Sequence, residues 1–352
     1  MFFKKKSKPV LGIDITATAI KLLELSKSGG KYRIESYSVE PLPANSVVEK
    51  NIADADAVGE AIGRAVKKSG SRIKDGAAAV AGSAVITKVI TMPADISDDD
   101  MESQIQLEAD QYIPFPLEEV NMDFEILGPT EGSEGQVNVL LAASRSENVD
   151  LRIAALEVGG LEAKIVDVEA FALENTVAMM AGDLFSGGED KVIAVADVGS
   201  AVTTFSVLEN LKIVYSREQA FGGAQLTEDI QRRYGLSYEE AGLAKKQGGL
   251  PDNYGPEVLE PFKESMAQQI SRAQQFFFSS SSIAQIDHLI LAGGCASIDG
   301  IADIVEAAVG IPTIVANPFA NMTLSSRIPA QALSNDAPSL MVSCGLALRS
   351  FD

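Results

Sequence analysis

The sequence predicts an α/β protein of two lobes built on one repeated plan, with an additional subdomain inserted in the first lobe. Three observations lead to this fold class. The chain has 352 residues, of which 46% are hydrophobic, so it can bury two sizeable cores. A pattern of three short strands occurs near the N-terminus and again near residue 190. An acidic segment of different composition separates the two copies.

The first copy of the pattern opens the chain. Val10–Ile15, Ile20–Leu25 and Tyr32–Val39 are rich in Val, Ile, Leu and Tyr, and turn residues separate them, so we expect three consecutive strands. A helix follows, because apolar residues recur at every fourth position from Val58 to Val66. The small residues of Ala77–Ala81 predict one further strand.

The acidic segment from Val89 to Ser144 contains thirteen Asp and Glu residues and no Lys or Arg. We expect a helix that begins after Ser97, a good N-cap residue, and two strands at Val120–Leu127 and Val137–Ala143. A second amphipathic helix follows and ends at Gly159-Gly160. This order of elements predicts a separate inserted subdomain.

The second copy of the pattern begins with three strands between Val192 and Ser216. Placing Asp14 over Asp197 aligns the two copies without a gap, so we interpret the lobes as an internal duplication. We expect a first lobe of residues 1–88, 164–190 and 320–352, an inserted acidic subdomain of residues 89–163, and a second lobe of residues 191–319 with 225–287 as its helical subdomain.

Charge and composition exclude several classes of function. The net charge of −20 argues against nucleic acid or an anionic membrane surface as the main ligand. Two cysteines and a single histidine, His288, exclude a disulfide framework, a zinc site and most His-dependent triads. No stretch predicts a membrane span, and the basic start Met1–Lys6 does not continue as a signal peptide. We therefore expect a cytoplasmic protein with a solvated N-terminal tail.

Three loops are candidates for one ligand site between the lobes. They are Asp14–Lys21 in the first lobe, Asp197–Ala201 in the second, and Leu289–Gly294, an apolar strand that runs into a double glycine. Facing hairpin turns can offer backbone N–H groups to a polyphosphate, and the two aspartates can hold Mg²⁺ through water. The double glycine allows close approach of a ligand.

In this order and with the duplication, these loops resemble those of the actin-like ATPase superfamily, which includes FtsA, MreB, the heat-shock chaperone ATPases and sugar kinases. Lys21 stands where a phosphate-contacting lysine is found in actin, and Gly293-Gly294 with Gly300–Asp303 resembles the adenosine loop. The resemblance implies a two-lobed actin-like ATPase fold with duplicated lobes and an FtsA-like inserted subdomain in the first lobe.

Two further segments extend this resemblance. Phe221–Gly223 resembles the interlobe segment of FtsA, and Tyr238–Ala241 with Lys245 resembles the adenosine-side helix. The resemblance implies ATP with Mg²⁺ as the ligand, bound by Asp14, Thr16, Ala17, Lys21, Asp197, Gly199, Ser200, Gly222, Gly223, Glu239, Lys245, Gly293, Gly294 and Cys295. Of these residues, Asp14 and Asp197 would orient the metal through water.

A narrower resemblance covers essentially the whole chain. Gly12–Ile15, Glu108–Pro116, Val166–Phe171 and Phe221–Thr227 resemble segments of the PilM family of type IV pilus assembly proteins. The resemblance implies an ATP-binding scaffold of the inner-membrane assembly platform. It also implies a partner, the short cytoplasmic N-terminal tail of the inner-membrane protein PilN, which would make any membrane contact indirect. Self-association remains open.

Some positions depart from the superfamily pattern. Thr16 and Ala201 stand where related loops often have glycine, and a Cβ limits how closely the backbone approaches phosphate. Glu169 is the best match to the acidic residue that positions attacking water in relatives, although a surface or capping role fits it equally well. We therefore expect nucleotide binding with at most slow ATPase activity.

The acidic insert also carries apolar residues, among them Ile105, Tyr112 and Phe115. Aromatic, aliphatic and Met side chains anchor short peptides, and the cytoplasmic tails of inner-membrane proteins tend to be basic. We expect these three residues near the contact with a PilN-like tail. The simpler interpretation of the acidic residues is a solvated surface that favours solubility.

Two other functions use the same fold. A small-molecule kinase of the sugar or acetate type would need a carboxylate base, for which Glu169 is the candidate. A filament-forming protein of the FtsA or MreB type would need matching surfaces on opposite sides of the molecule.

Overall fold

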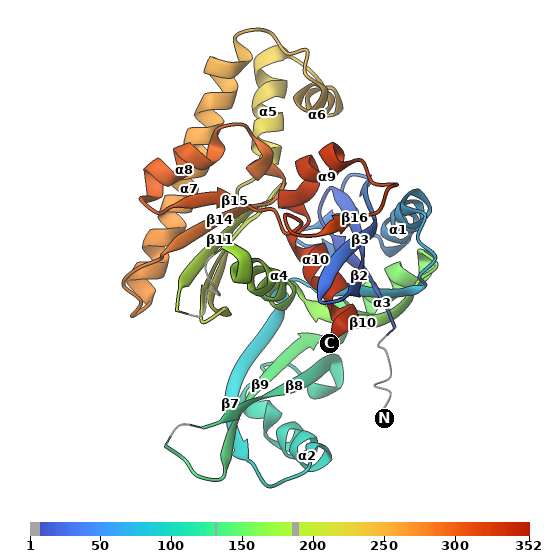
Figure 1. Cartoon of the computed structure of the whole chain (residues 1–352), viewed down its shortest axis with the longest axis vertical. Coiled ribbons are helices and arrows are strands. Elements are labelled where there is room, and N and C mark those ends of the chain that lie inside the picture. Colours follow the sequence, from blue (N-terminus) through green and yellow to red (C-terminus); the bar gives the residue numbers. More distant parts are fainter. Residues whose placement is uncertain (1–7, 131, 185–189) are drawn as a thin grey trace.

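A computed structural model describes residues 8–130, 132–184 and 190–352 of the chain. The basic start Met1–Lys6 lies outside these residues. Two lobes, each with its own sheet, lie side by side, and a smaller subdomain extends below them in Figure 1.

The first lobe contains a mixed sheet in the order β10-β6-β1-β2-β3-β16. Its strands are β1 (Leu11–Ile15), β2 (Ala19–Ser28), β3 (Lys31–Pro41), β6 (Asp75–Val80), β10 (Glu162–Val168) and β16 (Thr323–Leu324). The predicted three-strand pattern is present, with β1, β2 and β3 antiparallel, while β6 and β10 run parallel to β1.

The two faces of this sheet are covered by different helices. Along β2, Ile20 and Leu22 point towards α1 (Ala55–Ser69), whereas Leu23 and Leu25 pack on the side of α10 (Met341–Leu348). This alternation is the period of two that a strand buried on both faces requires. A short hairpin of β4 (Val47–Val48) and β5 (Asn51–Ile52) precedes α1, and α9 (Ala330–Asp336) precedes α10.

The second lobe repeats the topology of the first. Its sheet has the order β13-β12-β11-β14-β15, so its five strands are arranged as β3, β2, β1, β6 and β10 are in the first lobe. The strands are β11 (Val192–Val198), β12 (Thr203–Glu209), β13 (Lys212–Gln219), β14 (His288–Ala292) and β15 (Thr313–Val315). The common order confirms the duplicated lobes that the sequence predicts.

Helices cover the outer face of the second sheet and extend beyond one end of it. They are α5 (Gly223–Tyr234), α6 (Tyr238–Gln247), α7 (Glu260–Ser280) and α8 (Ile301–Val309). One face of α7 is buried, with Phe262, Met266, Ile270 and Phe277 in the lobe's main core. In Figure 1, α5 and α6 rise above the sheets on the side opposite the inserted subdomain.

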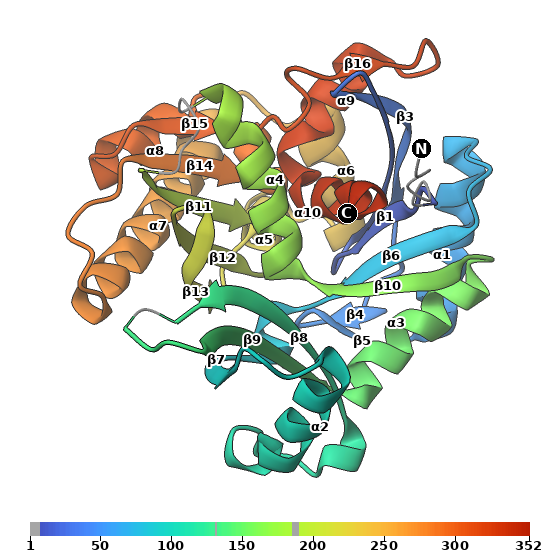
Figure 2. The same cartoon turned by 60° about the horizontal axis from the view of Figure 1, so that its bottom comes forward.

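Two helices cross between the lobes, α10 and α4 (Glu169–Leu184), and Figure 2 shows them between the two sheets. Leu173 and Val177 of α4 belong to a core cluster with Val195 and Ile290 of the second sheet. Since α10 packs on the first sheet, each helix belongs to one lobe and touches the helix of the other.

The inserted subdomain has its own three-stranded sheet in the order β7-β9-β8, with α2 packed on it. Its elements are β7 (Val85–Pro93), α2 (Asp98–Glu108), β8 (Val120–Pro129) and β9 (Gln136–Arg145). Ser97 is the N-cap of α2, as predicted, and its hydroxyl accepts a hydrogen bond from the Asp100 N–H.

The helix predicted to complete this subdomain lies elsewhere. α3 (Ser146–Val158) packs against α1, and Ala155 and Leu156 share the first-lobe core with Ile62. The separate sheet therefore ends at Arg145, whereas the sequence placed the end of the insert at residue 163. An amphipathic pattern predicts that one face of a helix is buried, but it does not predict which sheet that face packs against.

Candidate functional site

The first loop of the site lies at the end of β1. Asp14 and Lys21 are direct partners in the β1–β2 register, and the lysine Nζ lies 3.2 Å from Asp14 Oδ2. The Asp14 side chain is only 7% exposed. Because little water screens the two charges, their attraction is stronger than that of an exposed ion pair. The structure thus brings together two residues that the sequence assigned to one site.

Thr16 closes the turn between these two residues. Its hydroxyl donates to the Ala19 carbonyl at 2.8 Å and accepts from the Ala19 N–H at 3.1 Å, while the Thr16 N–H donates to the same carbonyl. The Thr16 side chain therefore stabilises the hairpin that also contains Ala17. These hydrogen bonds explain how the turn forms with Thr16 at a position where related loops often have glycine.

The second loop follows β11 and contains Asp197. Burial raises the pKa of this carboxyl group, while the positive charges of Lys21 and Lys50 oppose the rise. Asp14 acts in the same direction as burial, because its negative charge disfavours a second one nearby. Asp14, Lys21 and Asp197 therefore belong to one electrostatic cluster that includes both lobes.

Gly293 meets this second loop at the end of β14. A Cβ atom at Gly293 would lie 2.3 Å from the Val198 carbonyl oxygen and 2.5 Å from Asp197 Oδ1, and the residue has a φ of +86°. A side chain cannot be accommodated there, so the double glycine lets the β14 loop reach the Asp197 loop. Gly294 follows in the same turn, which leads into the segment before α8.

The start of α5 packs against the loop that contains Gly199 and Ser200. The Gly223 N–H donates to the Gly199 carbonyl at 3.0 Å, and the Ala224 N–H donates to the Ser200 carbonyl at 2.8 Å. Gly222 is the N-cap residue at this contact. These hydrogen bonds use the N–H groups of Gly223 and Ala224 within the protein, so the two glycines shape the loop rather than present those donors to a ligand.

Lys245 and Cys295 lie at the same contact. The Lys245 ammonium donates to the Gly223 carbonyl at 2.9 Å and to the Thr227 hydroxyl at 2.7 Å, and burial lowers its pKa. The Cys295 thiol lies 3.6 Å from the Gly199 carbonyl oxygen, and burial raises its pKa to about 11. Both predicted residues are thus placed beside the second loop, whereas Glu239 is exposed on α6.

Glu169, the predicted catalytic residue, begins α4 and forms an ion pair that no sequence motif predicts. Lys50, from the turn between β4 and β5, lies 2.8 Å from Glu169 Oε2 and 3.1 Å from Glu218 Oε1. Burial raises the pKa of Glu169, and the charge of Lys50 opposes the rise. The environment of Glu169 is therefore that of an interlobe charge cluster and not of an exposed helix cap.

The charges of this cluster favour an additional cation. The formal charges of its four carboxylates, Asp14, Glu169, Asp197 and Glu218, exceed by one those of its three cations, Lys21, Lys50 and Arg152. Among the residues that the structure describes, no group of three His, Cys, Asp or Glu could hold a metal ion by itself. Two aspartates supplemented by water and phosphate oxygens suit Mg²⁺, which keeps several waters in proteins.

The inserted subdomain contains the three residues predicted near the partner contact. Ile105 is 3% exposed and lies in the subdomain core with Met101 and Val139, so its side chain is not part of the free surface. Tyr112 and Phe115 are half-buried, and a cation lies over each ring. The cations are Lys88, 5.6 Å from the Tyr112 ring centre, and Arg145, 4.2 Å from that of Phe115.

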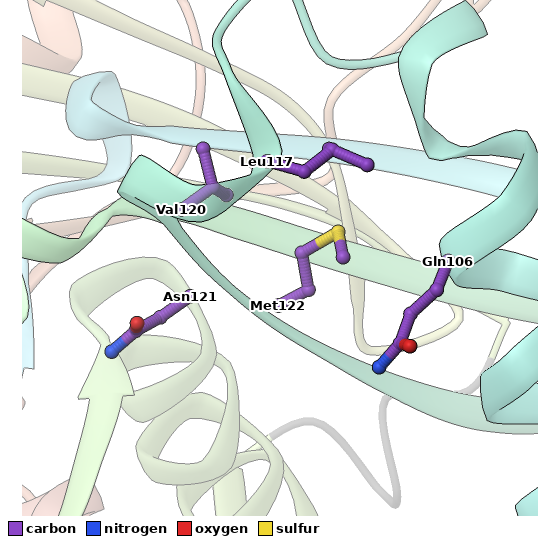
Figure 3. A pocket seen from close by; sticks show the side chains of 5 residues that line it. All are labelled: Gln106, Leu117, Val120, Asn121 and Met122. Carbon is purple, nitrogen blue, oxygen red and sulfur yellow. The ribbon is translucent and has the colours of Figure 1, made fainter.

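A pocket of about 510 Å³ opens beside these aromatic residues, and Figure 3 shows the side chains that line it, Gln106, Leu117, Val120, Asn121 and Met122. Three of them, the apolar ones, pack in the same cluster as Tyr112 and Phe115. The pocket was not predicted, because its lining comes from a helix, a turn and a strand whose packing only the fold determines.

Two sheets of one strand order, a pair of helices crossing between them, and an aspartate at the end of the first strand in each sheet define the actin-like fold class. The solved structure of the ethanolamine utilization protein EutJ from Carboxydothermus hydrogenoformans shares this fold. It matches with a TM-score of 0.57 at 16% identity, covering 97% of this chain and 89% of that one.

A second solved structure is more similar in sequence and in shape. It is described as a PilM-PilN type IV pilus biogenesis complex, and it matches with a TM-score of 0.80 at 27% identity, covering 98% of this chain and 99% of that one. The family model of the type IV pilus assembly protein PilM matches residues 12–351. The chain belongs to this family. In the described part of the chain, no helix is long and apolar enough to cross a membrane.

Proposed function

We propose that this member of the PilM family is a scaffold that binds ATP with Mg²⁺ between its lobes. The observation that carries the proposal is the cluster of Asp14 and Asp197, near the ends of the equivalent strands β1 and β11, with Lys21, the partner of Asp14 on β2. Its carboxylates supply oxygen ligands for a hydrated Mg²⁺, and the Lys21 ammonium supplies a partner for phosphate. Gly293 keeps the neighbouring loop close to Asp197.

Calorimetric titration with ATP tests this proposal, once with Mg²⁺ and once with excess chelator. We expect saturable binding that requires the metal, because the carboxylates repel phosphate when no cation lies between them. Absence of heat and of any thermal stabilisation by MgATP would refute nucleotide binding.

Turnover should be slow at most. Glu169 is the candidate for positioning the attacking water, but its carboxylate is held by Lys50 at 2.8 Å. The Thr16 side chain also stands in the first loop, where it limits the approach of backbone donors to phosphate. Steady hydrolysis faster than about one per second, the low end of ordinary enzyme rates, would contradict this part of the proposal. The same ion pair argues against Glu169 as the free base of a small-molecule kinase.

The proposed partner is the cytoplasmic N-terminal tail of a PilN-like inner-membrane protein, through which the scaffold would be held at the inner membrane. Three observations support it: the similarity to a structure described as a PilM-PilN complex, the acidic insert, and the pocket beside Tyr112 and Phe115. A basic tail would be attracted by the charge of the insert and retained by contacts with Leu117, Val120 and Met122 of the pocket.

A synthetic tail peptide and a single pocket variant test the partner site. Leu117→Asp places a charge in the pocket lining, and Val214→Asp places the same charge at an apolar side chain that is 49% exposed in the second lobe. We expect the peptide to bind wild type and Val214→Asp equally, and Leu117→Asp much more weakly, while MgATP binding survives in both. Equal peptide binding by the two variants would place the docking site elsewhere.

A further inference from the structure

The turn that carries Lys50 has an unfavourable backbone. Val47 and Val48 pair with Ile52 and Asn51, so Glu49 and Lys50 form a two-residue turn, and both have positive φ, 48° and 64°. Such turns usually contain Asn and Gly, because residues with a Cβ are strained in this region. A strained backbone persists only where the surrounding structure holds it, and it often occurs at functional positions.

Arg152 holds this turn from below. It is 3% exposed, and all three of its hydrogen bonds go to main-chain carbonyls. One of these is the Lys50 carbonyl, 3.0 Å from Arg152 Nη2, and the others belong to Ala79 and Asn148. A buried guanidinium thus fixes the backbone position of Lys50. Burying a charged group costs free energy, which suggests that the position of Lys50 matters for function.

The Lys50 side chain crosses from the first lobe to the second. Besides its contact with Glu169, its ammonium lies 3.1 Å from Glu218 of β13 and donates to the Thr204 hydroxyl at 3.2 Å. Burial alone would lower the pKa of Lys50, but the nearby carboxylates outweigh burial and raise it, so the group stays charged.

The duplication explains what Lys50 adds. In the first lobe, the residue opposite Asp14 is Lys21, whereas the equivalent residue opposite Asp197 in the second lobe is Thr204. Lys50 places its ammonium on Thr204, and its charge also acts on Asp197. The hairpin of the first lobe therefore adds a second positive charge beside Asp197, in addition to that of Lys21, and places it on Thr204, where the second lobe has no lysine of its own.

We propose that Lys50 is a specificity-determining residue of the nucleotide site, which contacts the terminal phosphate and makes the site prefer a nucleoside triphosphate to a diphosphate. This inference rests on the proposed nucleotide site between the lobes. The Lys50 ammonium, which contacts two carboxylates and the Thr204 hydroxyl, can exchange the hydroxyl for a phosphate oxygen, because a charged acceptor forms a stronger hydrogen bond than a neutral one. A nucleoside diphosphate lacks the terminal phosphate, so it cannot provide this new partner for Lys50.

The test compares ATP and ADP affinity, both with Mg²⁺, in wild type and two Lys50 variants. Lys50→Met keeps the length of the side chain without its charge, and we expect it to lose about tenfold or more in ATP affinity with a smaller change for ADP, as for one charged hydrogen bond. Lys50→Arg should keep the preference for ATP. Lys212→Met is the matched control, because Lys212 also pairs with a glutamate, Glu174 at 2.8 Å, but away from the charge cluster.

The outcomes separate the inference from the proposal beneath it. Wild type that binds neither nucleotide would overturn both. If Lys50→Met keeps the wild-type affinity for both ATP and ADP, or if wild type binds the two nucleotides equally, the inference is wrong while the nucleotide site stands. An equal loss for both nucleotides would assign Lys50 to holding the lobes together, which also overturns it. Thermal melting of each variant establishes that the proteins compared are folded.

Discussion

Gly345 of α10 crosses Ala172 of α4 at backbone contact. A Cβ atom at Gly345 would lie 1.7 Å from the Ala172 carbonyl oxygen, and one turn away the Thr176 hydroxyl donates to the Met341 carbonyl at 2.8 Å. Since α4 packs on the sheet of the second lobe and α10 on that of the first, this crossing sets how closely the two halves of the site approach each other.

Gly345→Ala should therefore destabilise the protein by about 3 kcal/mol, because the helices must separate to admit one methyl group. Gly182→Ala on α4 is the control, since a Cβ there meets nothing within 4 Å and alanine favours a helix. Urea denaturation of the two variants checks the difference. Equal midpoints for both would show that the crossing has room to relax.

Asp197→Ala should weaken MgATP binding by about tenfold or more while the fold remains intact, because a half-buried carboxylate at a strand end contributes little packing. Asp229→Ala is the control, since Asp229 forms an exposed ion pair with Arg232 on α5. Calorimetry gives the affinities, and circular dichroism monitors folding. An unchanged affinity in folded Asp197→Ala would remove this residue from the site.

Two neighbouring residues on α2 test the core of the inserted subdomain. Ile105→Glu buries a charge among Met101 and Val139 and should unfold the subdomain, at a cost of about 4 kcal/mol. Leu107→Glu should be nearly neutral, because Leu107 is 84% exposed. Hydrogen exchange of β7, β8 and β9 measures the effect. Equal protection in the two variants would contradict the burial of Ile105.

The two thiols should resist alkylation in the folded protein. Cys295 is 6% exposed and Cys344 is fully buried, and burial raises their pKa values to about 11 and about 12. A raised thiol pKa leaves less of the reactive thiolate at any pH below it, so labelling by iodoacetamide at pH 8 should be slow until guanidinium unfolds the chain. Rapid native labelling of Cys295 would show that the loop before α8 opens to solvent.

Local order was predictable from the sequence because strands, helices and turns leave periodic signals over a few residues. The three-strand pattern at Val10–Val39, its second copy from Val192, and the N-cap at Ser97 all lie where the structure has them. The equivalence of Asp14 and Asp197 also came from pattern alone, since a duplicated strand carries its end residue with it.

Long-range partners were decided only by the tertiary structure. The stripe on α2 is equally compatible with a core and with a docking face, and packing against β9 assigns Ile105 to the core. Lys50 lies 119 residues before Glu169 along the chain, and no motif of the sequence links them. Such an ion pair depends only on the distance between the two charges in the folded protein, so it leaves no periodic pattern in the sequence. The sequence by itself determined the duplicated lobes and the two aspartates, while the fold decided which lysine joins them, because that choice depends on chain packing across the lobes.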